Sequence, residues 1–365
     1  MDIYALLLIL VYFLTHLYIK LGLKRSCSHK HTYSENHTVT IIVAAKNEAE
    51  NISECISSLK KLDYKYINEI FLVNDNSTDN TKEIMLQETN GFPLFKVIDS
   101  SKESSTNLKG KANALNTAIG LSTGEIIIGT DADCEVESTW VTELVKYYDD
   151  KTGMVCGFTH IRCDDSLFEK VQALDWIYLQ TLASGSSGLN MTLSCIGNNL
   201  SFRKDVYKKL GGYQSIDFSV TEDLALMQKI HYDKRFKIKY PVNNHALIST
   251  NACKNFNELY RQKRRWFKGG LKINILGLFL GLQLYPVNFA LLTGWLYLSL
   301  PVYLIFVLIK LLSDLLLIYT TIKEFEITSL YKYFVPFQLY FALYGLLLPL
   351  TFLFTQKIVW KERKF

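Results

Sequence analysis

The stretch Glu125-Ile126-Ile127-Ile128-Gly129-Thr130-Asp131-Ala132-Asp133 is the starting point for interpreting this chain. Its isoleucines are β-branched and apolar, which is typical of a strand buried on both faces. We therefore predict a strand at 125–129 that leads into Asp131 and Asp133. Two carboxylates one residue apart at a strand end can hold a hard divalent cation, although such pairs are also common in exposed turns.

The segment before this strand alternates between extended and helical patterns. Short apolar runs rich in β-branched residues predict the strands, and longer mixed segments between them predict helices. Strand–helix alternation implies an α/β fold with a mostly parallel sheet flanked by helices, whose ligands bind at the carboxyl ends of the strands. The predicted strands are 39–45, 69–73 and 95–98, and the predicted helices are 49–59, 78–86 and 111–119.

Polar residues follow the strands and begin several of the helices. Asp75 follows the second strand, where its carboxylate could accept a hydrogen bond from a nucleobase imide. In the same turn, Asp79 is interpreted as a residue that stabilises the start of a helix. Lys111 begins the next helix, where an ammonium group beside the helix N-terminus suits a phosphate. A solvated lysine is the alternative at that position.

A further acidic motif, Thr221-Glu222-Asp223, precedes a helix predicted at 224–231. Asp223 could serve there as a general base that takes a proton from an attacking hydroxyl group. The alternative is that Thr221 caps the helix and that the two acids only interact favourably with its dipole. The motif alone leaves both interpretations open.

The basic stretch Tyr260-Arg261-Gln262-Lys263-Arg264-Arg265-Trp266 contains the pattern Gln-x-x-Arg-Trp. The planar guanidinium of Arg265 can bind a diphosphate through two hydrogen bonds, and the Trp266 ring can support a sugar or another flat ligand. A basic membrane anchor with an interfacial Trp is the alternative.

Composition indicates a cytosolic domain attached to a membrane. Hydrophobic residues make up 49% of the chain, and the excess lies at its two ends. The net charge of +5 is modest, and its basic residues gather beside apolar segments, which favours lipid headgroups and phosphates over nucleic acid. Seven cysteines without a Cys-x-x-Cys pair argue against a disulfide framework or a zinc site.

The apolar run at 3–19 is predicted to be an uncleaved N-terminal membrane anchor. Lys20, Lys24 and Arg25 follow it and place the next domain in the cytoplasm by the positive-inside rule. We thus expect a multi-pass protein of the cell membrane, in contact with membrane lipids, whose catalytic domain is cytoplasmic.

The C-terminal region is predominantly apolar. Residues 269–283 are predicted to form an interfacial helix, and 287–309 and 334–354 to span the membrane. The segment 310–322 is ambiguous, and its Lys310 and Asp314 lie four residues apart, where they could pair on one helix face. Two spans would leave the basic tail in the cytoplasm, and three would place it outside. The expected divisions are 1–22 (anchor), 38–268 (catalytic domain), 269–285 (interfacial helix), 286–356 (two or three spans) and 357–365 (basic tail).

Taken in chain order, these motifs resemble those of the family 2 inverting glycosyltransferases. Within that family they are most similar to the membrane-bound group of cellulose, hyaluronan and chitin synthases. The resemblance extends from Thr40 to Gly270. It is carried by Val43-Ala44-Ala45-Lys46-Asn47-Glu48, Asn74-Asp75-Asn76-Ser77-Thr78-Asp79, Gly110-Lys111-Ala112-Asn113-Ala114-Leu115-Asn116, Asp131-Ala132-Asp133, Thr221-Glu222-Asp223, and the residues Gln262, Arg265 and Trp266.

The resemblance implies a Rossmann-like GT-A domain between terminal transmembrane helices. It implies a nucleotide-diphosphate sugar as the donor, with a UDP-sugar expected, and a lipid or glycan as the acceptor. It also implies Mg²⁺ or Mn²⁺ held by Asp131 and Asp133, and catalysis by Asp223 with Glu222 beside it. The substrate-binding residues that it implies are Glu48, Asp75, Lys111, Asp131, Gln262, Arg265 and Trp266.

Two positions depart from the family pattern. Asn74 replaces the first acid of a pair, so nucleobase binding would rest on Asp75, and Ala45 stands where the family often has Pro. Few spans are available for a polymer channel, so single transfer competes with processive synthesis. A catalytically silent membrane scaffold and a nucleotidyltransferase are further alternatives. His245 is a further candidate, as an additional metal ligand.

Overall fold

The computed structural model describes residues 1–27, 36–103, 108–164, 166–270 and 274–352, and the backbone of 359–360 and 363–364. The chain divides into two compact units. The helical unit consists of Met1–Cys27, Ile161–Leu193 and Ala252–Phe365, and the sheet unit of Ser28–His160 and Ser194–Asn251. The expected continuous domain at 38–268 is therefore interrupted, because 161–193 and 252–268 pack with the terminal helices.

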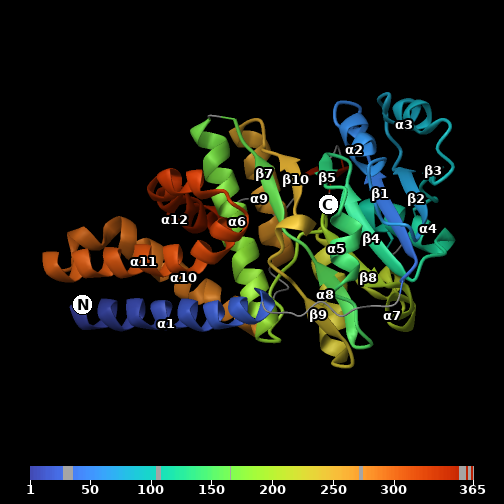
Figure 1. Cartoon of the computed structure of the whole chain (residues 1–365). Helices are drawn as coiled ribbons and strands as arrows, with labels where there is room; N and C mark the ends of the chain where they lie inside the picture. The colour runs from blue at the N-terminus through green and yellow to red at the C-terminus, as the bar shows by residue number, and fades with distance from the viewer. Residues whose placement is uncertain are drawn as a thin grey trace. The chain divides into compact units, whose positions relative to one another are not determined.

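The sheet unit contains a seven-stranded sheet in the order β3-β2-β1-β4-β8-β6-β9 (Figure 1). Only β8 runs antiparallel to its neighbours, so the predicted α/β fold with a mostly parallel sheet is confirmed. The strands are β1 (Val39–Ala45), β2 (Ile67–Asn74), β3 (Phe95–Asp99), β4 (Ile126–Asp131), β6 (Thr152–Cys156), β8 (Leu200–Arg203) and β9 (Lys237–Lys239).

Both faces of the central strands are apolar, as expected for parallel strands covered by helices. In β1, Ile41 and Val43 belong to a core shared with Ile52 and Ile56 of α2. Ile42 lies between them in sequence and faces the opposite side of the sheet. The helices of this unit are α2 (Ile52–Leu59), α3 (Thr81–Thr89), α4 (Gly110–Leu121), α5 (Trp140–Val145), α7 (Lys204–Lys209) and α8 (Glu222–Asp233), with short 3₁₀ turns at Tyr213–Ser215 and Asn244–Ala246.

A small second sheet has the order β5-β10-β7. β5 (Cys134–Val136) comes directly after the Asp131–Asp133 turn and pairs antiparallel with β10 (Ile248–Asn251). β7 (Thr159–Arg162) is the strand in which the chain passes from the sheet unit to the helical unit. The pairing of β5 with β10 therefore holds the residues that directly follow the acidic turn.

The register of the parallel strands brings their carboxyl ends into line. Ala45 of β1 pairs with Asn74 of β2, and Ala44 of β1 pairs with Asp131 of β4. Asn74 also pairs with Asp99 at the end of β3. The turns that follow these four strands therefore lie along one edge of the sheet, where ligands bind in folds of this kind.

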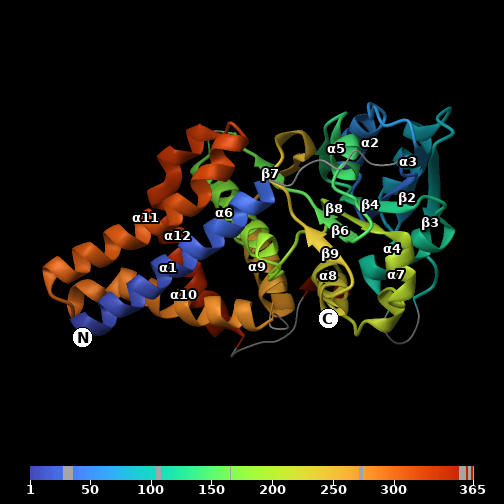
Figure 2. The ribbon, with the colours of Figure 1, turned by 60° about the horizontal axis from the view of Figure 1, so that its bottom comes forward.

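The helical unit contains four helices that are long and apolar enough to cross a membrane. They cover α1 (Asp2–Cys27), α10 (Ile275–Thr293) with the following 3₁₀ turn Gly294–Leu296, α11 (Leu300–Glu324), and α12 (Phe334–Thr351) with the preceding 3₁₀ turn Thr328–Tyr333. α1 packs against both α10 and α11 (Figure 2). The remaining helices are α6 (Leu167–Gly188) and α9 (Phe256–Gly270), and the backbones of β11 (Val359–Trp360) and β12 (Arg363–Lys364) pair antiparallel.

The C-terminal helices begin and end differently from the sequence prediction. The helix expected at 269–283 begins later than predicted, because α9 extends to Gly270 and α10 begins at Ile275 and continues to Thr293. The span expected at 287–309 is wrong, because the helix is interrupted between Thr293 and Leu300. The ambiguous segment 310–322 is part of α11. Three C-terminal helices are thus long enough to span, and the side chains of the basic tail lie outside the described residues.

α6 packs closely on α1 through small residues. A Cβ added at Gly22 would lie 2.0 Å from the carbonyl oxygen of Gly185, and one at Gly188 would lie 2.0 Å from the carbonyl oxygen of Gly22. Ser26 donates a hydrogen bond to the carbonyl oxygen of Ser184 at 2.8 Å. Small residues at a helix contact allow the backbones to approach, as is common between membrane helices.

A polar network is buried among α1, α6, α11 and α12. Lys310 and Asp314 are completely buried and form the predicted i,i+4 ion pair at 2.9 Å. Tyr12 donates to the other carboxylate oxygen of Asp314 at 2.6 Å, and Lys310 also donates to Gln338. Tyr178 lies 3.2 Å from the Tyr12 hydroxyl and so links α6 to the network. Buried charges require such partners, especially in an apolar surrounding.

Candidate active site

The turn after β2 holds Asp75 at the sheet edge. Asp75 is 2% exposed, its backbone N–H donates to the Ala45 carbonyl at 2.8 Å, and its carboxylate accepts from the Ser100 hydroxyl at 3.3 Å. Asn74, at the position where the family has an acid, donates to Asp99 at 2.8 Å and accepts from the Ser77 N–H at 3.1 Å. Its amide makes both bonds at once, which a carboxylate could not do because it has no donor.

The loops after β1 and β2 are tied to each other. Asp79 accepts from the N–H groups of Ala49 and Thr81 at 3.1 Å each, which supports the structural role expected for it. The Thr81 hydroxyl accepts from the Glu48 N–H at 2.8 Å, and the Glu48 carboxylate accepts from the side chain of Asn51 at 2.8 Å. These bonds hold Glu48 at the same sheet edge as Asp75.

The Asp131–Asp133 turn is in contact with two buried thiol groups. Cys55 donates to the Asp131 carbonyl at 3.6 Å, and Cys134 donates to the Asp133 carboxylate at 3.5 Å. Burial raises the pKa of both thiols, and the nearby charges of Asp133 and Asp131 raise it further. Both cysteines therefore stay protonated and apolar in character, and the carboxylates provide the ligand chemistry of this turn.

Lys111, in the first turn of α4, lies between two acidic motifs. Its ammonium group is hydrogen-bonded to Asp131 and lies 3.7 Å from the Glu222 carboxylate. Burial alone would lower the pKa of Lys111, but the charges of Asp131 and Glu222 raise it above its usual value. The N–H of Gly110 is bonded to the Glu103 carboxylate at 2.9 Å, so an anion already occupies this helix start. The structure thus places Lys111 among carboxylates, where a phosphate could replace one of them.

Asp223 lies in the first turn of α8, because the helix begins at Glu222, two residues before its predicted start at 224. Its carboxylate accepts from the Leu224 N–H at 2.8 Å. Thr221 makes no capping hydrogen bond with its side chain, which argues against a cap at Thr221. The bond from the Leu224 N–H agrees with the other part of the alternative, in which the acids interact with the start of the helix. A Cβ added at Gly197 would lie 2.9 Å from a carboxylate oxygen of Asp223 and 3.0 Å from its Cβ. Gly197 therefore makes the room that Asp223 occupies, a role that no sequence motif indicated.

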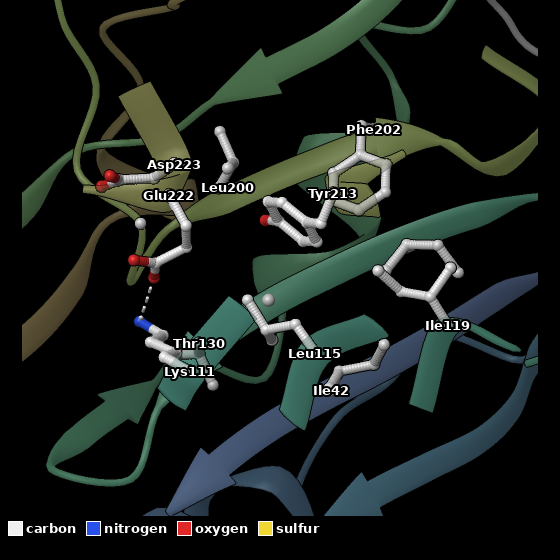
Figure 3. A pocket seen from close by; sticks show the side chains of 13 residues that line it. Ile42, Lys111, Leu115, Ile119, Thr130, Leu200, Phe202, Tyr213, Glu222 and Asp223 are labelled. Carbon is white, nitrogen blue, oxygen red and sulfur yellow. Dashed lines mark ion pairs between the residues drawn. The ribbon is translucent and has the colours of Figure 1, made fainter. Parts of the chain in front are cut away.

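A cavity in the sheet unit lies beside these residues. Figure 3 shows Glu222, Asp223 and Lys111 at one side of it and the apolar side chains of Ile42, Leu115 and Ile119 at the other. The hydroxyl of Thr130, which also lines the cavity, is buried and has no hydrogen-bond partner among the described residues. The cavity therefore combines an apolar floor with polar groups at its rim, as ligand sites commonly do.

The Gln-x-x-Arg-Trp residues lie on α9 in the helical unit. The amide oxygen of Gln262 is buried and finds no hydrogen-bond partner within the described part of the chain. Trp266 packs against Trp176 of α6 with ring centroids 5.3 Å apart, and the Lys263 ammonium lies 4.6 Å from the Trp266 ring. These contacts cover part of the indole that the sequence suggested as a platform. Neither Trp176 nor Lys263 was expected to contribute.

The structure thus brings most of the predicted site residues together within the sheet unit. Glu48, Asp75, Asp131 and Asp133 follow the aligned strand ends, and Lys111 connects Asp131 to Glu222, next to Asp223. Gln262, Arg265 and Trp266 form a second group on α9. His245, the further candidate for a metal ligand, is exposed in a 3₁₀ turn.

The acidic turn fits a hard cation that a substrate helps to bind. Asp131 and Asp133 offer carboxylate oxygens, which Mg²⁺ and Mn²⁺ prefer, and Mg²⁺ commonly uses one or two carboxylates with substrate phosphates. Among the described residues, no group of three or more His, Cys, Asp or Glu side chains could hold a metal ion by itself. A donor diphosphate and water would complete the coordination of a cation at this turn.

Comparison with solved structures supports the fold. The chain is similar to the mannosyltransferase PcManGT from Pyrobaculum calidifontis, solved in complex with GDP-Man and Mn²⁺. The similarity has a TM-score of 0.57 at 18% sequence identity and covers 93% of this chain and 96% of that one. At this identity the comparison shows the fold, which is of the GT-A kind.

Comparison of sequences leads to the same family. Relatives include the poly-beta-1,6-N-acetyl-D-glucosamine synthases of Staphylococcus epidermidis, 28% identical over 68% of this chain, and Staphylococcus aureus, 29% identical over 64%. The matches span 58% and 55% of those two relatives. The model described as "Glycosyl transferase family 2" matches residues 40–211, and "Glycosyl transferase family group 2" matches 126–355, more than half of the chain. The chain therefore belongs to glycosyltransferase family 2.

Proposed function

We propose that this protein is a membrane-bound, metal-dependent, inverting glycosyltransferase. It moves a sugar from a nucleotide-diphosphate sugar, with a UDP-sugar expected, to a hydroxyl group of a lipid or saccharide acceptor. The observation that carries the proposal is the cluster of carboxylates around a lysine at one edge of the sheet. In this cluster, Lys111 contacts both Asp131 and Glu222. Such a cluster provides a diphosphate site and a candidate base within a single unit.

Asp131 and Asp133 hold Mg²⁺ or Mn²⁺ in this proposal. When bound, the cation neutralises charge on the donor diphosphate and so makes the nucleotide a better leaving group. Lys111 contributes a further positive charge, and Asp75 and Glu48 bind the nucleotide part of the donor. Arg265 and Gln262 of α9 bind the diphosphate, for which the two-pronged guanidinium is well suited. Trp266 contacts the acceptor with the part of its ring that is not covered.

Asp223 acts as the general base, with Glu222 beside it. The acceptor hydroxyl gives its proton to the Asp223 carboxylate as its oxygen forms a bond to the anomeric carbon. The bond from that carbon to the diphosphate oxygen breaks on the opposite side, and its electron pair leaves with the nucleoside diphosphate. In-line attack of this kind inverts the anomeric configuration. The contact between Asp223 and Gly197 and the bond from the Leu224 N–H limit the positions that the carboxylate can take.

The proposal is tested by incubating the purified protein with Mn²⁺ and a panel of nucleotide-diphosphate sugars and measuring release of the nucleoside diphosphate. Asp223→Asn should lower turnover by about 10² or more while leaving donor affinity nearly unchanged, as for other positioned acid–base groups. Asp205→Asn, at an exposed carboxylate of α7, is the matched control. Near-normal turnover of the Asp223 variant would remove it from the role of base, and pyrophosphate release would indicate a nucleotidyltransferase instead.

Similarity to synthases of a polysaccharide favours a second candidate within the same chemistry, processive synthesis. The staphylococcal relatives are named as poly-beta-1,6-N-acetyl-D-glucosamine synthases. Counting the labelled sugars in each product molecule after incubation with radiolabelled donor separates the two. One sugar per acceptor supports single transfer, and a distribution of longer products supports a synthase. No turnover with any donor would favour a silent scaffold.

A further inference from the structure

Lys263 lies inside the Gln-x-x-Arg-Trp motif but is 5% exposed, unlike the exposed Arg261 two residues before it. Its ammonium group is hydrogen-bonded to the carboxylate of Asp175 on α6, which is completely buried. The Tyr344 hydroxyl of α12 donates to the second oxygen of that carboxylate at 3.3 Å. A single buried ion pair thus connects α6, α9 and α12.

The pair also contacts the functional motif directly. The Lys263 ammonium lies 4.6 Å from the Trp266 ring and 5.0 Å from the Tyr344 ring. Trp176, the neighbour of Asp175, also packs against Trp266. Lys263 and Trp266 are three residues apart and share one face of α9, so this face is fixed against α6 and α12.

Fixing one face of a helix determines where its other side chains point. Gln262 and Arg265 each precede one of the two anchored residues and are themselves three residues apart, so they share the adjacent face of α9. A rotation of α9 about its axis would move both of them together. The amide oxygen of Gln262 is buried and has no hydrogen-bond partner among the described residues. Because it is already removed from water, a hydrogen bond from a ligand to this oxygen would involve no further loss of hydration there.

A buried ion pair is weak evidence for stability. Moving two charges out of water is unfavourable, and well-packed apolar residues at the same positions are often as stable or more stable. A direction-dependent role explains the pair better, because an ion pair with an additional hydrogen bond from Tyr344 allows few rotations of the helix, whereas apolar contacts allow many.

We propose that Asp175 and Lys263 are positioning residues that fix the rotation of α9 and thereby orient Gln262 and Arg265 for the donor diphosphate. This inference rests on the proposed role of those two motif residues. It assigns to Asp175, which no motif contains, a part in the transfer reaction, and it distinguishes Lys263 from the exposed Arg261.

The test compares Asp175→Asn, Lys263→Met and the double variant Asp175→Leu/Lys263→Met in the full-length protein in detergent. Each single variant should lower kcat/KM for the donor by about tenfold or more, since small misplacements of binding groups have effects of this size. The double variant, which leaves no unpaired charge, should recover the thermal midpoint of the wild type but not its kcat/KM. Arg261→Met is the matched control on the exposed face of α9, and its kcat/KM should be unchanged.

Different outcomes identify different failures. If the double variant recovers both its thermal midpoint and its kcat/KM, the pair is only structural and the inference is wrong. Normal kcat/KM in Asp175→Asn, with Arg265→Ala inactive, likewise overturns the inference but leaves the proposed function intact. If Arg265→Ala itself retains full activity, the role of the motif in the proposed function fails first. Should a single variant not fold, the double variant alone still decides between the two roles.

Discussion

At the scale of single residues, the geometry around Asp223 depends on a glycine. Gly197→Ala is expected to lower turnover by about tenfold or more, because the added Cβ would lie 2.9 Å from the Asp223 carboxylate and push that flexible side chain away. Fold stability should change little, since the carboxylate can move more easily than backbone. The measurement is kcat together with the thermal midpoint.

Gly120→Ala in α4 serves as the control for this prediction, because an added Cβ there meets nothing within 4 Å. The Gly120 variant should keep wild-type turnover. If Gly197→Ala keeps it as well, Asp223 does not need its described position, and the proposed base would have to be found elsewhere.

The acidic turn supplies a second prediction for individual residues. Asp133→Ala should abolish Mn²⁺-dependent donor binding, because one remaining carboxylate is a poor anchor for a small divalent cation. Titration calorimetry with the nucleoside diphosphate, with and without Mn²⁺, measures this directly. Treatment of the wild type with a chelator should have the same effect and should be reversed by added Mn²⁺. Unchanged affinity in the variant would show that these carboxylates only form a turn.

At the scale of elements, the sequence predicted the sheet unit well because its signals are local. Strand β1 was predicted with its observed ends, and each polar turn follows its strand as expected. The N-terminal end of α11 also had a local signal, Ser299-Leu300-Pro301, since Pro is favoured in the first helical turn and Ser before it. The apolar residues around this signal obscured it.

α6 could not be predicted from such signals. It contains Gln172, Asp175 and Gln180, which are typical of an exposed helix face, yet all three are almost completely buried. Their partners include Lys263 and the Cys253 backbone, roughly eighty or more residues further along the chain. Burial of a polar residue depends on a distant partner, which a single sequence does not reveal. For the same reason, the role of Gly197 in making room for Asp223 could not be predicted from the sequence.

The buried pair in α11 allows a stability prediction at the same scale. Lys310→Met should lower the free energy of unfolding by about 3–5 kcal/mol, because it leaves the Asp314 charge buried with fewer partners. The double variant Lys310→Met/Asp314→Leu should lose clearly less, since no buried charge remains. Thermal unfolding in detergent compares the variants. Lys323→Met, at an exposed position of the same helix, is the control. Equal losses in the single and double variants would contradict this account.

At the scale of the whole molecule, the contacts of the helical unit predict its membrane topology. Asp2, at the start of α1, is hydrogen-bonded to the N–H and hydroxyl of Ser299 in the turn between α10 and α11. The N-terminus and this turn should therefore lie on the same side of the membrane. Basic residues lie in the last turns of α1 and along α9, so the C-terminal end of α1 and the helix α9 should lie on the cytoplasmic side.

The end of α12 is expected on the same side as α9. The Phe352 ring lies 4.9 Å from the Phe267 ring of α9, and the Arg264 guanidinium lies 4.8 Å from it. The chain leaves α9 and returns to it after three helices that are each long enough to span. The chain therefore ends α12 on the same side of the membrane as α9. This is possible only if an even number of the helices α10, α11 and α12 cross the membrane completely. The basic tail is then expected in the cytoplasm, as its charge also predicts.

Two measurements on intact cells test this topology. A reporter that is active only in the cytoplasm, fused after Phe365, should be active. In a variant with Cys27→Ser, a cysteine introduced by Tyr297→Cys in the turn after α10 should react with a membrane-impermeant thiol reagent from outside. An inactive C-terminal reporter, with Tyr297→Cys still labelled, would mean that all three helices cross and that Phe352 cannot remain against α9. Protection of Tyr297→Cys would instead place the turn between α10 and α11 inside the cell. Because Asp2 is hydrogen-bonded to Ser299 in this turn, the N-terminus would then also lie inside, and α1 could not cross the membrane.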